Sequence, residues 1–167
     1  MGDIESRAVG MTARPEDRRG AIRIAGVLAI LATVHFVDHA VRGRMVHSRH
    51  LNPLWYHSGW PAEGQFTPYT ASLVVVYGLL LTGIVLTRRG PMRAGYWLAT
   101  AVVIGGVVAY VHFIPGSRTE TPAVILGSYD EPAIGIPAVL VTFAIVACLV
   151  VMAVNAVVAA RRSGRWW

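Results

Sequence analysis

The sequence predicts an all-α integral membrane protein, a four-helix transmembrane bundle arranged up-down-up-down. Its 167 residues are 54% hydrophobic and only 14% charged, whereas charged residues make up about 25% of an ordinary soluble domain. Four apolar stretches divide the chain, and each is long enough to cross a hydrocarbon core of about 30 Å as a helix. The arginines gather on one predicted side of these stretches. The predicted spans are residues 21–41, 69–86, 94–113 and 134–158.

The first twenty residues are polar and show no hydrophobic period, so we expect a flexible cytoplasmic tail over 1–20. The membrane domain then covers 21–160. No small-x-small cleavage site closes the first span, and ionisable residues from His35 onward follow instead. We therefore expect this span to be retained as a membrane helix rather than removed as a signal peptide.

The segments between the spans differ in length and composition. Residues 42–68 form a long loop rich in histidine, tryptophan and proline, which breaks long helices. Residues 87–93 are too few for anything but a tight hairpin between the second and third spans. The loop over 114–135 contains several prolines and glycines and is expected to be irregular. Residues 161–167 form a basic, aromatic cytoplasmic tail.

The distribution of basic residues predicts the orientation. All fifteen are arginine, and eleven lie in the N-terminal tail, the 87–93 hairpin and the C-terminal tail. Because basic residues beside membrane helices are retained on the cytoplasmic side, both termini are expected inside a multi-pass protein of the cell membrane. The net charge of +6 then reflects membrane topology and lipid headgroups, and no nucleic-acid partner is expected.

All six histidines map to the outer half of this arrangement, and three of them continue two stripes of small residues. Small residues let membrane helices approach closely, so each stripe predicts a packing face. On a helical wheel the first-span stripe continues to His39, with His35 at its edge, and the third-span stripe continues to His112. The stripes are Ala25, Ala29 and Ala32 in the first span and Ala101, Gly105 and Ala109 in the third.

These residues suggest a metal site at the outer ends of the first and third spans. His35 and His39 are four residues apart and so share one helical face, and His112 is expected at a similar depth. Asp38 is expected either to ligate the metal or to orient a ligating imidazole. Imidazole with carboxylate suits Zn, Cu or non-haem Fe. Alternatively, His39 and His112 would hold a haem b iron as an axial pair.

Three classes of function remain open at this point. The first is a non-catalytic accessory or assembly subunit in which the histidines are structural, with Asp38 and Arg42 neutralising each other. The second is a metal- or haem-binding protein with redox or hydrolytic activity, and the third is a proton-coupled transporter subunit. The expected partners are the lipid bilayer and either other membrane subunits or further copies of the chain. His47, His50 and His57 are expected to be wet interfacial residues, and Trp97 an interfacial anchor.

Overall fold

The computed structural model describes residues 15–45, 68–114, 121–127, 129 and 131–167. The predicted tail up to residue 14 and the loop carrying His47, His50 and His57 lie outside these ranges. Every regular element in the described part of the chain is an α-helix. The helices are α1 (Pro15–Met45), α2 (Pro68–Arg89), α3 (Ala94–His112), α4 (Pro122–Gly127) and α5 (Pro132–Ser163).

Four of these helices are long and apolar enough to cross a membrane, as expected of a multi-pass membrane protein. Each overlaps one predicted span, and α1 and α5 extend beyond 21–41 and 134–158 at both ends. α1 begins at Pro15, so the last residues of the predicted tail are helical. The stretch expected to be irregular contains the short helix α4. Proline begins α1, α2, α4 and α5, because its missing N–H costs nothing in a first helical turn.

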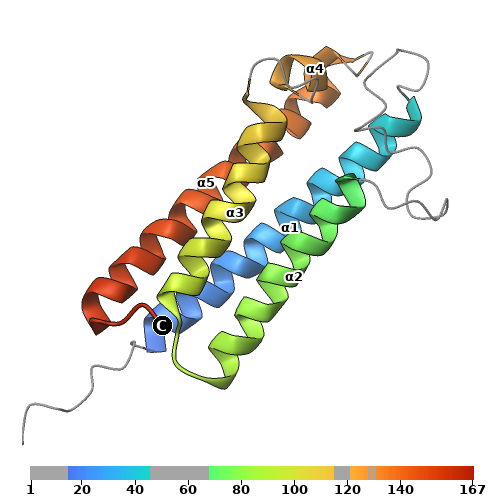
Figure 1. Ribbon diagram of the computed structural model, residues 1–167. Helices are drawn as coiled ribbons and strands as arrows, with labels where there is room; N and C mark the ends of the chain where they lie inside the picture. The colour runs from blue at the N-terminus through green and yellow to red at the C-terminus, as the bar shows by residue number, and fades with distance from the viewer. Residues whose placement is uncertain (1–14, 46–67, 115–120, 128, 130) are drawn as a thin grey trace, which may run out of the picture.

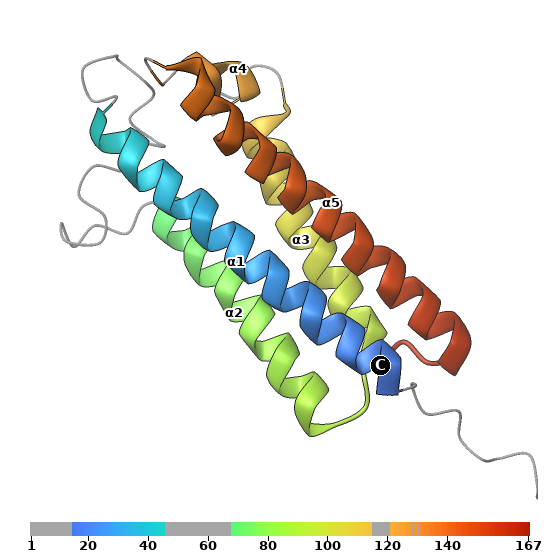
Figure 2. The ribbon, with the colours of Figure 1, turned by 180° about the vertical axis from the view of Figure 1, so that it is seen from behind.

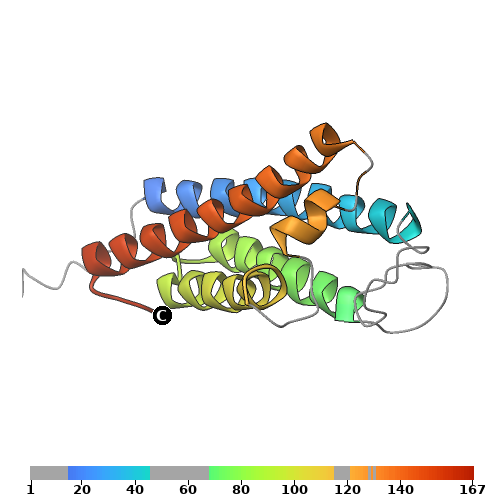
Figure 3. The same cartoon turned by 90° about the horizontal axis from the view of Figure 1, so that it is seen from above.

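The four long helices lie side by side in one bundle (Figures 1 and 2). α1 packs against α2 and α5, and α3 packs against the same two helices. α1 and α3 therefore face each other across the bundle. The short helix α4 packs on α5 at one end of the bundle (Figure 3).

The long helices bury small side chains and expose branched apolar ones. On α1 the buried stripe is Ala21, Ala25, Leu28 and Ala32, and it continues to His35 and His39. Large apolar residues on the outward faces of all four helices stay exposed, among them Ile30, Val74, Leu81, Val102 and Leu140. An exposed apolar surface of this extent is typical of contact with lipid rather than water.

On α3 the predicted packing stripe is only partly correct. Ala101 is buried, but Gly105 is half-buried and Ala109 is exposed. Both line a surface groove of about 240 Å³ beside α5. The buried face of α3 instead includes Trp97, Ala101, Ile104, Val111 and His112.

Trp97 lies on this buried face of α3. It is a fully buried side chain rather than an interfacial anchor, with 1% of its surface exposed. Its indole Nε1 donates to Thr87 Oγ1 over 2.9 Å, and its ring lies against Gly83 of α2. Trp97 is therefore a large buried ring of the α2–α3 contact, with its one polar atom satisfied.

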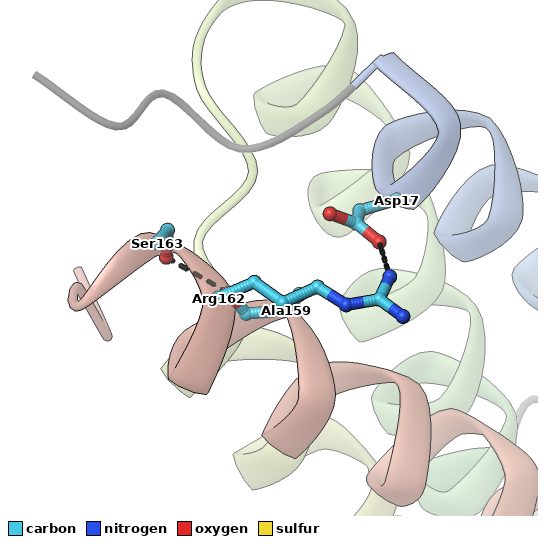
Figure 4. A network of polar contacts seen from close by, with 4 residues as sticks. All are labelled: Asp17, Ala159, Arg162 and Ser163. Carbon is cyan, nitrogen blue, oxygen red and sulfur yellow. Dashed lines mark hydrogen bonds and ion pairs between the residues drawn. The ribbon is translucent and has the colours of Figure 1, made fainter.

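A polar network ties the helices together at the end that holds the C-terminus. Nη1 of Arg162 in α5 donates to Oδ1 of the buried Asp17 in α1 over 3.2 Å (Figure 4). The guanidinium of Arg18 donates to the carbonyl oxygens of Thr87 and Arg88, the last turn of α2. The N–H of Gly95 donates to the carbonyl oxygen of Trp166 over 2.7 Å, so the C-terminal segment folds back onto α3.

Candidate metal site

Three histidines meet inside the bundle at the end opposite this network. His35 and His39 come from α1, and His112 is the last residue of α3. All three are buried, with 8%, 4% and 2% of their surface exposed. One ring nitrogen from each lies within 4.8 Å of the other two. The three imidazoles predicted as ligands are therefore brought together.

The backbone explains how each ring reaches this point. His35 and His39 are one helical turn apart, and both follow the buried alanine stripe of α1 toward the centre of the bundle. His112 continues the buried face of α3 beyond Ile104 and Val111. The ring centroids of His35 and His112 are 5.0 Å apart, and those of His39 and His112 are 6.0 Å apart.

His35 and His39 also interact directly. Their Nε2 atoms are 2.9 Å apart, so one ring donates Nε2–H and the other accepts. This contact requires different tautomers in the two rings. A bound metal would replace the shared proton, because each ligating nitrogen must present its lone pair to the ion.

Asp38 does not belong to this cluster of mutually close ligand atoms. Its Oδ1 accepts a hydrogen bond from the hydroxyl of Tyr129, which lies between α4 and α5. The expected role of Asp38 in orienting a ligating imidazole stays a prediction. The expected partner side chain of Arg42 lies outside the described residues.

Tyr129 is the residue of this region that sequence reasoning missed. It joins α1 to the segment between α4 and α5, and its ring also lies close to Gly135, where an added Cβ would be 3.3 Å from Tyr129 Cδ2. Ile125 of α4 is buried with 1% exposure. Tyr129 and Asp38 are 91 positions apart, and no helical or strand period connects residues so distant.

The geometry suits a single ion better than a haem. An axial pair requires a flat macrocycle between two imidazoles, but the ring of His35 lies 4.3 Å from that of His39 and 5.0 Å from that of His112. Three imidazoles around one point are instead a typical ligand set for zinc or copper.

Comparison with known proteins adds no family to this description. No protein-family model matches the chain, and neither a curated protein nor a solved structure matches it significantly.

Proposed function

We propose that this chain is a multi-pass protein of the cell membrane that binds a transition-metal ion through His35, His39 and His112. The observation that carries the proposal is the convergence of three buried imidazoles whose ligand atoms lie within 4.8 Å of one another. Ionisable residues within membrane helices are costly, and are functional by default. Three of them at one point, drawn from helices on opposite sides of the bundle, supply a complete set of protein ligands for an open metal site.

In this proposal the bundle is oriented up-down-up-down with both termini in the cytoplasm. The arginine-rich end, with Arg18, Arg88, Arg89 and Arg162, faces the anionic inner leaflet. The histidine site then lies toward the outer face, below α4. Asp38 lies outside the ligand set, where its carboxylate accepts a hydrogen bond from the Tyr129 hydroxyl.

The test is metal analysis of the intact chain, purified in mild detergent, with an optical spectrum of the same sample. We expect one zinc or copper ion per chain and no Soret band. His35→Ala and His112→Ala should each abolish stoichiometric metal. Phe36→Leu is the matched control, because Phe36 neighbours His35 in sequence and space but offers no ligand atom. A metal-free wild-type chain that also fails to take up added Zn²⁺ or copper would overturn the proposal.

A second candidate is a non-catalytic accessory or assembly subunit in which the histidines are structural. The observation that favours it is the hydrogen bond between His35 and His39, because it gives the Nε2 atom of each imidazole a partner without an ion. The two roles differ in their response to a chelator. A metal site predicts that removing the ion, with EDTA for zinc or with a Cu⁺-specific chelator for copper, lowers the melting temperature of the wild-type chain but not of His112→Ala. A structural role predicts that His112→Ala lowers it and that neither chelator changes either protein.

A further inference from the structure

The end of the bundle opposite the histidines presents arginines that the protein itself does not neutralise. Arg162 is paired with Asp17, and Arg18 donates to carbonyl oxygens of α2. Within the described part of the chain, Arg93 and Arg165 are exposed and form no ion pair with a carboxylate. Residues 1–14 contain two arginines and two acidic residues, so they leave this excess of positive charge unchanged. The excess is independent of the metal site and is complementary to a negatively charged partner.

Arg93 and Arg165 are brought together at one corner of this end. The N–H of Gly95 donates to the carbonyl oxygen of Trp166 over 2.7 Å, and a Cβ at Gly95 would lie 2.8 Å from the ring of Trp167. The C-terminus accordingly lies beside the start of α3 (Figure 3). Arg93 lies two residues before Gly95, and Arg165 lies directly before Trp166. The contact between the C-terminal segment and α3 therefore places both arginines at the same corner.

The exposed arginines of this end border the apolar surface directly. On α2, Val85 and Arg89 are one helical turn apart on the same face, and both are exposed. On α5, Val154 and Arg161 are two helical turns apart on one face, and both are exposed as well. A ligand at this end therefore meets positive charge beside apolar side chains. A phospholipid has this division between a charged headgroup and acyl chains, whereas nucleic acids and soluble phosphates carry no such chain.

We propose that the corner formed by Arg93, Arg165 and Trp167 binds the phosphate of an anionic phospholipid. A guanidinium forms paired hydrogen bonds with phosphate oxygens. The quaternary ammonium of a choline lipid would add positive charge at the same place, so a zwitterionic lipid binds less tightly. Trp167 is 78% exposed, as is typical of an aromatic side chain at the headgroup level. Because the contact with Gly95 already holds the C-terminal segment, little conformational entropy is lost on binding.

The test is native mass spectrometry of the full chain in mild detergent, titrated with phosphatidylglycerol and phosphatidylcholine that carry the same acyl chains. We expect one phosphatidylglycerol per chain, bound at least about tenfold more tightly than phosphatidylcholine. The double variant Arg93→Gln with Arg165→Gln should weaken phosphatidylglycerol binding about tenfold. Arg19→Gln with Arg23→Gln is the matched control, because it removes two exposed charges from α1, across the bundle from α3. This control should bind phosphatidylglycerol as the wild-type chain does.

Gly95→Ala tests the corner without changing its charge, because a Cβ at this position displaces the ring of Trp167. It should also weaken phosphatidylglycerol binding, and melting temperatures in lipid-free detergent check that every variant is folded. Equal losses of binding in the two double variants would assign the effect to diffuse charge and overturn the inference. A wild-type chain that does not prefer phosphatidylglycerol would overturn it too.

Competition separates the lipid from other phosphates. Glycerol phosphate or a short RNA that displaces phosphatidylglycerol at equal concentration would assign the corner to that ligand and overturn the inference. Failure of both to compete supports recognition of headgroup and acyl chains together. None of these outcomes bears on the metal site, because His35, His39 and His112 lie at the opposite end of the bundle.

Discussion

The imidazole rings of His35 and His112 lie 5.0 Å apart although they belong to helices on opposite sides of the bundle. In a bundle of four helices such a pair meets only across the central axis. The small side chains of α1, Ala25 and Ala32, leave the centre narrow enough for the rings to reach each other. The proposed site is therefore a product of how the bundle packs.

The hydrogen bond between Tyr129 and Asp38 links the segment between α4 and α5 to α1, beside the histidines. Tyr129→Phe should destabilise the protein by about 1–3 kcal/mol, because a carboxylate loses a hydrogen-bond donor in a partly buried position. Hydrogen exchange of the α4 amides, followed by mass spectrometry, should quicken. Tyr110→Phe is the control, since this ring is exposed on α3. Equal exchange rates in both variants would contradict a role of this hydrogen bond in stabilising α4.

The ion pair between Arg162 and Asp17 compensates the charge of a buried carboxylate. Asp17 is 5% exposed, and its Oδ2 has no hydrogen-bond partner among the described residues. Arg162→Ala should cost about 1–3 kcal/mol, less than for a fully buried pair because half of the Arg162 side chain is exposed. The control is Arg161→Ala, because Arg161 is the exposed residue next to Arg162.

Adding Asp17→Asn to Arg162→Ala should recover part of that loss, because the amide removes the unpaired charge. Thermal unfolding in detergent measures all four proteins. A double variant no more stable than Arg162→Ala alone would mean that the pair is not the cause of the loss.

Two glycines of α2 offer a matched test of helix packing. A Cβ at Gly83 would lie 2.7 Å from the rings of Tyr96 and Trp97, whereas a Cβ at Gly78 meets nothing within 4 Å. Gly83→Ala should destabilise the protein by roughly 1–3 kcal/mol through overpacking. Gly78→Ala should be neutral, or stabilising by up to about 1 kcal/mol. Equal melting temperatures for the two variants would show that α2 and α3 do not approach this closely.

The proposed orientation predicts which ends of the helices are accessible from outside the cell. In a Cys148→Ala background, a thiol at Glu131→Cys should react with a membrane-impermeant maleimide in intact cells. A thiol at Arg165→Cys should react only after the membrane is permeabilised. Both positions are exposed at the surface of the protein, so a difference in labelling reports the side of the membrane. The reverse pattern would invert the topology.

The sequence alone predicted four membrane-length helices and the inward-facing positions of the three histidines, because both features depend on local properties. Apolar runs without charges remain helical in a membrane wherever they pack, and the spacing of His35 and His39 places them on one face regardless of neighbours. The alanine stripe of α1 is regular enough to predict its buried side.

The tertiary structure decided which face of α3 packs and what surrounds the histidines. Ala101, Gly105 and Ala109 follow one another at intervals of four residues, but the face of α3 that buries Trp97 against Gly83 leaves Ala109 exposed. Tyr129 meets Asp38 only because α4 packs on α5. Such outcomes follow from the volumes and polar atoms of residues far apart in the chain, which compete for one core. The residue pattern of a single helix therefore does not predict which of these side chains fill the core.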